Sequence, residues 1–396
     1  MTKKSDAPAI RFKGFSDAWE QRKLSEMCGT FEYGLNAAAK EFDGKNKYIR
    51  ITDIDDASRE FLLSDLSSPD ICLDGMSKYL LSSGDIVFAR TGASVGKTYI
   101  YRENDGIVYF AGFLIRAKVN QDNDAEFVFQ STLSPSYEKY IRITSQRSGQ
   151  PGVNAQEYGE YDLFAPSKEE QQRIGQFLRG IDNLITLHQR KFEKLTNVKK
   201  SMLEKMFPQN GSSYPEIRFK GFTDPWEQRK VQDVADRFDN LRIPVAANLR
   251  VHGTTPYYGA NGIQDYVDGF THDGEFVLVA EDGANDLKNY PVKCVNGRIW
   301  VNNHAHVLQG KARIADNSFL AFAISQSDIE SLLVGGGRAK LNAETLMSIE
   351  FRLPCLQEQY RIGEYLSQLD NLITLHQREL EKLQNIKKSM LEKMFV

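Results

Sequence analysis

The chain has 396 residues, of which 41% are hydrophobic and 26% charged, a composition typical of folded globular proteins rather than disordered ones. Single hydrophobic cores stop growing at roughly 250–300 residues, so we expect at least two domains. The net charge of −3 at pH 7 excludes a uniformly basic surface, and any contact with nucleic acid must therefore depend on local patches.

Cysteine usage and hydropathy predict no metal site and no membrane segment. The four cysteines are widely scattered, without a CxxC pair or a close Cys/His cluster, so we expect neither a zinc site nor a disulfide framework. The first nine residues lack the apolar core of a signal peptide, and no run of about 18 apolar residues occurs. We therefore expect a cytoplasmic protein that is neither exported nor membrane-spanning.

An internal duplication dominates the sequence. Residues 10–24 recur at 217–231 with three substitutions, and residues 182–207 recur at 370–395 with four. Between these boxes, residues 25–152 and 232–340 show no convincing alignment. A recent duplication with relaxed loops is the simpler explanation, but loops rarely exceed a hundred residues with strand patterns of their own. The alternation instead indicates that the near-identical segments form a frame that occurs twice, and that each copy of this frame carries a different functional block.

Each copy of the second box predicts a long helix. Apolar residues recur at steps of three and four from Ile174 to Met206 and from Ile362 to Met394. A seam with a period near 3.5 residues predicts a coiled coil, and the obvious partner of each helix is the other copy. The short link from Pro208 to Pro215 favours antiparallel pairing. The lysines along both helices fit a solvated face, a contact with phosphates or a docking surface, and these alternatives stay open.

The unaligned blocks are rich in predicted strands. In the first block these are residues 84–90, 98–101 and 108–110, and in the second 275–280 and 298–301. Short strands broken by Gly, Asp and Asn predict an α+β fold with a curved sheet in each block. We expect boundaries at 1–166 and 211–354 for the two strand-rich domains, and at 167–210 and 355–396 for the helices.

No motif in the sequence predicts catalysis. Residues 92–98 resemble a phosphate-binding loop, but three residues instead of four separate the glycines, and a strand-like run follows where that loop needs a helix. A tight glycine turn that presents Arg90 and Lys97 is the favoured interpretation. His304 and His306 have the spacing of a metal pair, but no neighbouring sequence completes a ligand set, so a strand or groove-lining role is favoured. We expect no catalytic residue, no metal and no cofactor.

The order of these motifs resembles the specificity subunits of type I restriction-modification systems over essentially the whole chain. Each half has a Trp-Glu-Gln box (Trp19, Trp226), an unrelated block and a Glu-Gln pair (Glu170, Glu358) before its helix. Further matching motifs lie at residues 84–92, 279–283 and 300–306. The resemblance implies two target-recognition domains, separated by two long antiparallel helices with pseudo-twofold symmetry.

The resemblance also implies a function and partners. Each domain would recognise one half of a split double-stranded DNA site, two modification (methyltransferase) subunits would attach to the helices, and restriction subunits would join that core. The chain itself would be a non-catalytic, sequence-specific DNA-binding subunit. The alternatives are a self-contained DNA methyltransferase or nuclease, and a coiled-coil scaffold without a DNA role.

Polar and basic residues in the glycine-broken loops are the candidate DNA contacts. Arginine suits guanine, asparagine suits adenine and lysine more often holds phosphate. The candidates are Arg90, Thr91, Lys97, Arg147 and Gln150 in the first block, and Tyr258, Asn261, Asn302, Asn303, Arg338 and Lys340 in the second.

Overall fold

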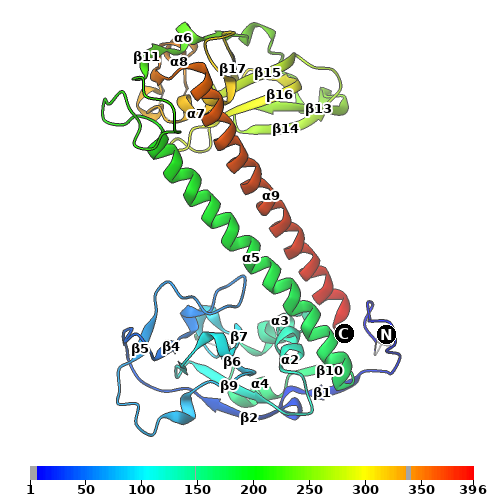
Figure 1. Ribbon diagram of the computed structural model, residues 1–396. Helices are drawn as coiled ribbons and strands as arrows, with labels where there is room; N and C mark the ends of the chain where they lie inside the picture. Colours follow the sequence, from blue (N-terminus) through cyan, green and yellow to red (C-terminus); the bar gives the residue numbers. More distant parts are fainter. Residues whose placement is uncertain (1–6, 148, 336–339) are drawn as a thin grey trace. The chain divides into compact units, whose positions relative to one another are not determined.

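The computed structural model describes residues 7–147, 149–335 and 340–396 and divides into two compact units (Figure 1). The first unit takes in the described residues up to Arg190 together with those from Gln377 onward, and the second spans Lys191–His376. Two helices of 39 residues, α5 (Lys168–Met206) and α9 (Leu356–Met394), each contribute one part to either unit. Within the described ranges, no helix combines the length and apolar character needed to cross a bilayer.

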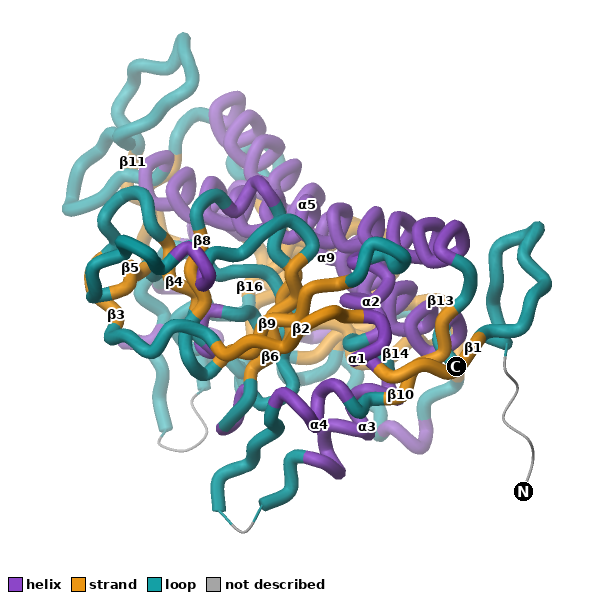
Figure 2. Tube along the Cα trace, turned by 90° about the horizontal axis from the view of Figure 1, so that it is seen from below, coloured by secondary structure: helices purple, strands orange, loops and turns teal. Residues whose placement is uncertain are grey.

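A four-stranded antiparallel sheet forms the centre of the first unit. Its strands lie in the order β2 (Cys28–Tyr33), β9 (Leu114–Val119), β6 (Asp85–Ala89) and β7 (Thr98–Ile100), and Figure 2 shows β2, β9 and β6 side by side. A separate ribbon pairs β1 (Glu20–Lys23) with β10 (Asp162–Ala165). The helices around the sheet are α1 (Leu24–Met27), α2 (Ala125–Ser131), α3 (Pro135–Thr144) and α4 (Ala155–Gly159). Small two-stranded sheets join β3 (Ala39–Glu41) to β5 (Ser67–Pro69) and β4 (Lys47–Ile49) to β8 (Val108–Phe110).

A six-stranded sheet forms the centre of the second unit. Its order is β12 (Ala235–Arg237), β17 (Ala305–Gly310), β15 (His272–Ala280), β16 (Val292–Val301), β13 (His252–Gly259) and β14 (Gly262–Val267). A ribbon pairs β11 (Glu227–Lys230) with β18 (Glu350–Leu353). The helices are α6 (Val231–Val234), α7 (Asn317–Ser325) and α8 (Ala343–Ser348). The strands predicted from the sequence in both blocks, and the α+β fold class, are confirmed.

The two units share a core that the sequence comparison missed. The order β2-β9-β6-β7 matches β12-β17-β15-β16, and α2 and α7 each follow the corresponding strand, β9 or β17. The register pairs Ala89 with Leu114 in one sheet and Ala280 with Ala305 in the other, which makes these positions equivalent. Buried strand positions require only apolar side chains of fitting volume, so the two cores share a fold without sequence identity.

The long helices pair antiparallel within each unit. In the first unit, Lys387 Nζ lies 2.5 Å from Asp182 Oδ1, so the late part of α9 contacts the early part of α5. In the second unit, the equivalent pair is Lys199 Nζ with Asp370 Oδ1, also at 2.5 Å. Each contact joins the late part of one helix to the early part of the other. The predicted antiparallel pairing is therefore confirmed.

The repeated boxes form the same aromatic contact twice. In the first unit, the Phe127 ring lies 5.9 Å from Trp19 and 5.3 Å from Phe395. In the second unit, the equivalent rings of Trp226 and Phe207 lie 5.7 and 5.5 Å from Phe319 of α7. Each trio joins a Trp-Glu-Gln box, the helix after the sheet and the end of a long helix. This shared contact explains why the Trp-Glu-Gln box and the end of the long helix are nearly identical in both halves, and it places Phe127 and Phe319 at equivalent positions of the helix after the sheet.

The Glu-Gln pairs bind each box and each sheet domain to a long helix. Arg11 makes a bidentate ion pair with the buried Glu170 at 2.7 and 2.8 Å, and Arg218 makes the same pair with Glu358. Gln171 Oε1 accepts a hydrogen bond from the Asp124 amide at 3.0 Å, which fixes the start of α2. Gln359 and the Asp316 amide repeat this bond at the start of α7.

A glycine in each long helix makes room for the helix start that packs against it. A Cβ on Gly175 would lie 2.6 Å from Asp124 Oδ1 and 3.0 Å from the Phe127 amide nitrogen, and Gly363 is equally crowded by Asp316 and Phe319. Gly180, in the same helix as Gly175, has no atom within 4 Å of the corresponding position. Close packing therefore requires a glycine at residue 175, whereas residue 180 has room for a side chain.

We expect Gly175→Ala to destabilise the first unit by about 1–3 kcal/mol, because the methyl group overpacks the cap of α2. Gly180→Ala is the matched control and should stabilise α5 by about 0.5–1 kcal/mol, since alanine is the better helix former. Urea unfolding curves of both variants test this. A loss of stability from both substitutions, or from neither, would contradict the packing.

Candidate nucleic-acid interface

A cluster of loops meets at the end of β6 in the first unit. The Arg90 amide donates to the Phe113 carbonyl at 3.0 Å, and the Arg90 carbonyl accepts from the Val153 amide at 2.9 Å. Thr91 pairs with Gly152 in an antiparallel bridge. We call residues 90–92, 113 and 150–153 the first loop cluster. Three segments far apart in the sequence thus present their side chains together.

The first loop cluster exposes aromatic, cationic and amide groups. The Arg90 guanidinium lies 5.1 Å from the centre of the Tyr33 ring, and the Tyr33 and Phe113 side chains are 45% and 57% exposed. Gln150 is exposed, and its Nε2 lies 3.0 Å from where a Cβ on Gly92 would stand. The arginine and the amide can bind base edges or phosphates, and the exposed aromatic rings beside them can contact bases.

The other two candidates of the first unit are held in ion pairs. The Lys97 ammonium group pairs with Asp56, and its side chain is 15% exposed. Arg147 pairs with Glu157 and donates to the Thr144 carbonyl at 2.9 Å. A short 3-10 turn at residues 92–94 and then β7 follow Arg90, so the expected strand after the glycine run is confirmed. Lys97 and Arg147 would have to exchange a carboxylate for a phosphate to bind DNA.

The second unit has an equivalent loop cluster at the end of β15. The Glu281 amide donates to the His304 carbonyl at 2.9 Å, and the Glu281 carbonyl accepts from the Leu341 amide at 2.8 Å. Asp282 pairs with Lys340 in an antiparallel bridge. These three contacts repeat those of the first loop cluster. We call residues 281–282, 304 and 340–341 the second loop cluster.

Acidic side chains and their hydrogen-bond partners occupy the second loop cluster. Asp282 Oδ1 lies 2.5 Å from His304 Nδ1, while Glu281 binds Lys340 at 2.8 Å and Arg242 at 2.7 Å. Burial would raise the pKa of Glu281, but hydrogen bonds from Lys340 and Arg242 outweigh it and hold the pKa below its usual value. The carboxylate of Glu281 is therefore ionised and paired.

His306 is buried beside this cluster and binds two oxygen atoms. Its side chain is 1% exposed, Nδ1 lies 2.7 Å from Asp239 Oδ2, and Nε2 lies 2.9 Å from the Leu341 carbonyl oxygen. Burial would raise the pKa of Asp239, but hydrogen bonds from His306 and the Val307 amide lower it below its usual value. Each of the two histidines thus has a carboxylate partner that sequence order did not reveal. In the described ranges, no group of three or more His, Cys, Asp or Glu could hold a metal ion.

The candidates predicted in the second block differ in exposure. Tyr258 is 7% exposed, and Asn302, at 4%, accepts from the His304 amide at 2.8 Å. Asn261 donates to the Gly283 carbonyl and accepts from the Asn285 amide, both at 2.9 Å. Asn303 is exposed, whereas Lys340 is paired with Glu281. Arg338 lies outside the described residues.

Sequence reasoning missed Tyr33, Phe113 and Asp282. Tyr33 ends β2, Phe113 directly precedes β9, and Asp282 lies within the 279–283 motif, so each adjoins the end of a sheet strand. Residues at strand ends are the usual positions for binding side chains on a rigid scaffold. That rule could have suggested them, but only the strand order shows that they meet the other candidates.

The sequence profile of the type I restriction modification DNA specificity domain matches residues 16–197 and 223–385. The chain belongs to this family. Its members are the DNA-recognition components of type I restriction-modification systems, so neither a self-contained methyltransferase or nuclease nor a scaffold without a DNA role is favoured.

Named relatives and a solved structure agree with this family. A putative type I restriction enzyme specificity subunit of Haemophilus influenzae is 41% identical over 163 residues, which cover 41% of this chain and 42% of that protein. The putative MjaX specificity subunit of Methanocaldococcus jannaschii is 22% identical over 94% of this chain and 92% of its own length. The crystal structure of the type I S subunit from M. genitalium shares the fold, with a TM-score of 0.75, 13% identity, and coverage of 98% of this chain and 99% of that one.

The two histidines of the second unit provide a matched pair of substitutions. We expect His306→Ala to cost about 3 kcal/mol, because it leaves the Asp239 carboxylate and the Leu341 carbonyl buried without their donor. His304→Ala, at a side chain 41% exposed, should cost less than about 1 kcal/mol. Urea unfolding at pH 7 compares the variants. Equal losses would show that His306 does not hold this part of the fold.

Proposed function

We propose that the chain selects the DNA target of a type I restriction-modification complex by binding double-stranded DNA through both sheet domains, one for each half of a split sequence. The observation that carries this proposal is the pair of loop clusters. The same three backbone contacts hold Arg90, Thr91 and Phe113 in one domain and Glu281, Asp282 and His304 in the other. Two different half-sites require two different sets of side chains on equivalent supports.

The exposure and the ion pairs of the candidate residues suggest different roles in DNA binding. Arg90, Thr91 and Gln150 are proposed to reach base edges, and Lys97, Arg147 and Lys340 to hold phosphates after exchanging their carboxylate partners. Asn303 is proposed as an exposed contact of the second domain. The hydrogen bonds of Asn261 and Asn302 and the burial of Tyr258 favour support of the loops, and Arg338 stays a proposed contact.

The outward faces of α5 and α9 are proposed to bind two copies of one modification subunit. From Asp182 to Met206, α5 differs from α9 at residues 191, 192, 196 and 198 only, so most exposed positions carry the same residue twice. Leu184 and Leu187 are 46% and 45% exposed, and their counterparts Leu372 and Leu375 are 43% and 52% exposed. One chain can bind two copies of the same partner when it presents the same surface twice.

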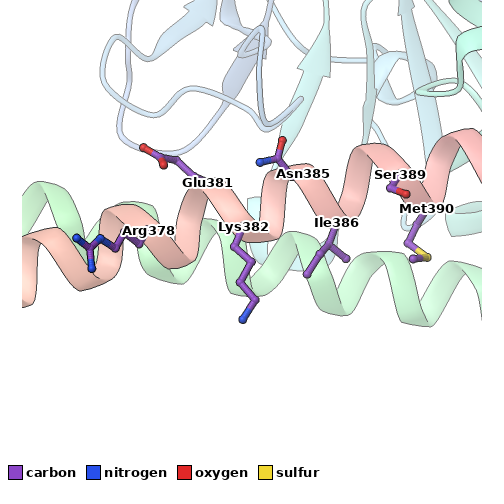
Figure 3. A pocket seen from close by; sticks show the side chains of 7 residues that line it. All are labelled: Arg378, Glu381, Lys382, Asn385, Ile386, Ser389 and Met390. Carbon is purple, nitrogen blue, oxygen red and sulfur yellow. The ribbon is translucent and has the colours of Figure 1, made fainter. Parts of the chain in front are cut away.

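An open groove of about 550 Å³ runs along the late part of α9 (Figure 3). We propose that it belongs to the docking surface, because its polar side chains have identical counterparts in α5. Ile386 is the one lining residue that differs, with Val198 at the equivalent position. The residues that line the groove are Arg378, Glu381, Lys382, Asn385, Ile386, Ser389 and Met390.

The chain is proposed to be non-catalytic and to bind no cofactor of its own. The sequence has no methyltransferase cofactor motif, and a strand follows the glycine run at residues 92–98 where a phosphate-binding loop needs a helix. In this proposal, the modification subunits supply methyl transfer, and restriction subunits join the assembled core. The isolated chain should therefore transfer no methyl group to DNA.

We expect Leu187→Glu to reduce the number of bound modification subunits from two to one, because it places a carboxylate in an apolar contact. Leu375→Glu should have the same effect at the other helix, and the double variant should bind none. Lys191→Glu is the matched control, since α9 already carries Glu379 at that position. Native mass spectrometry gives the stoichiometry. Two bound subunits in the double variant would place the docking surface elsewhere.

We expect replacement of residues 232–340 by the block of a relative to change one half of the DNA target. The replacement must keep Asp316 and Phe319, because these residues pack against Gly363 and Trp226 of the frame. Methylation mapping in the complete complex identifies both half-sites. A replacement that alters both halves, or neither, would contradict recognition by separate domains.

A further inference from the structure

We propose that Asp282 and His304 form a base-recognition pair of the second domain, selective for a base that presents an exocyclic amino group in the major groove. Adenine N6 and cytosine N4 are the two sources of this group. The inference rests on the proposed function, because it assumes that this domain binds DNA.

The backbone places this pair where the first domain presents its exposed side chains. Asp282 occupies the position of Thr91, because each forms the bridge that closes its loop cluster. His304 occupies the position of Phe113, because the carbonyl of each accepts the amide of the residue after the central strand. The pair therefore stands on the same backbone support as Thr91 and Phe113 of the first domain, although the side chains differ.

The pair is accessible, unlike the neighbouring histidine. The Asp282 and His304 side chains are 26% and 41% exposed, whereas His306 is 1% exposed and bonds to Asp239 and Leu341. The Asn261 side chain binds the backbone at Gly283 and Asn285, directly after Asp282. This anchoring limits the movement of the loop, and a preorganised side chain loses less entropy on binding.

The chemistry of the pair selects a donor. His304 Nδ1 binds Asp282 Oδ1, and this geometry leaves Oδ2 and Nε2 as the groups that a ligand can meet. A carboxylate only accepts hydrogen bonds, so it matches the amino group of adenine or cytosine and repels the carbonyl oxygens of guanine O6 and thymine O4. The pair therefore discriminates by attraction and by repulsion.

The charge of the pair is compatible with a DNA surface. A carboxylate without a partner would be repelled by phosphates, but Asp282 accepts a hydrogen bond from His304, and Glu281 keeps its ion pair with Arg242 when Lys340 moves to a phosphate. These contacts stabilise both carboxylates locally. The carboxylate can then act at short range on a base edge.

The test uses the chain assembled with its modification subunits and a DNA library degenerate in both half-sites. For Asp282→Asn, which adds a donor to the same shape, we expect the preference for the amino-bearing base at one position of the second half-site to fall about ten-fold or more. The first half-site should stay unchanged. The base that is lost distinguishes adenine from cytosine.

Two further variants make the result decisive. Asp273→Asn removes a more exposed carboxylate at the opposite end of β15 and should leave both half-sites unchanged. His304→Gln removes the partner of Asp282 and should weaken discrimination at the same position. Urea unfolding of each variant confirms that the domain is folded.

Three outcomes would overturn the inference. These are an unchanged preference in Asp282→Asn, an equal change in both half-sites, and inactivity of the folded variant toward every library member. Failure of the proposed function looks different, because the unmodified chain would then show no split target at all. A split target with wild-type recognition by Asp282→Asn refutes only the assignment of this pair.

Discussion

The contact between each sheet domain and its long helix is the constraint on which the rest of the structure depends. Asp124 caps α2, and the same carboxylate and amide rest against Gly175 and Gln171 of α5. Side chains at these positions cannot vary freely, because a larger residue at the glycine would separate the helices and a shorter one at the glutamine would leave a buried amide unpaired. The bidentate pair of Arg11 with the buried Glu170 adds a similar constraint, since loss of either residue leaves the charge of the other one unpaired. The second unit repeats each of these contacts, which explains why Arg11, Glu170, Gln171 and Gly175 have identical counterparts in the second half.

The same constraint explains where the two domains are free to differ. Both sheets keep four strands in one order, but the first domain adds β3, β4 and β5 after β2, whereas the second adds β13 and β14 after β12. These additions lie outside the contact with Gly175 and Gln171, although Glu60, between β4 and β5, accepts a hydrogen bond from Thr186 of α5 at 3.0 Å. The loop clusters at the ends of β6 and β15 are fixed by backbone hydrogen bonds, which do not depend on side-chain identity. A fixed backbone with free side chains is the arrangement that allows recognition to change while the fold stays the same.

Sequence reasoning found the local features and missed the pairings that join distant residues. The helices and strands followed from apolar periodicity, and antiparallel pairing of the helices followed from the duplicated frame and the short link. The shared sheet order was missed because apolar core residues substitute for one another, as Phe88 and Val279 do at equivalent positions.

The carboxylate partners of the histidines were missed because Asp239 lies 67 residues before His306 and Asp282 lies 22 residues before His304. Residue type alone suggested Tyr258 and Asn302 as DNA contacts, but the sequence does not show burial, and both side chains have little exposed surface.

The ion pairs of the candidate interface reconcile a net charge of −3 with binding to a polyanion. Each domain has a lysine near its loop cluster that is paired with a carboxylate: Lys97 with Asp56 in the first domain and Lys340 with Glu281 in the second. Binding of a phosphate to such a cation replaces one anion by another, so the gain is smaller than for an unpaired lysine. If these cations bind phosphates as proposed, non-specific affinity is low and a larger share of the binding free energy must come from base contacts that match the sequence. Under the proposed function, such a chain would need additional DNA contacts from its modification subunits, which would link DNA binding to assembly on the long helices and favour target recognition by the complete complex over capture of DNA by the isolated chain.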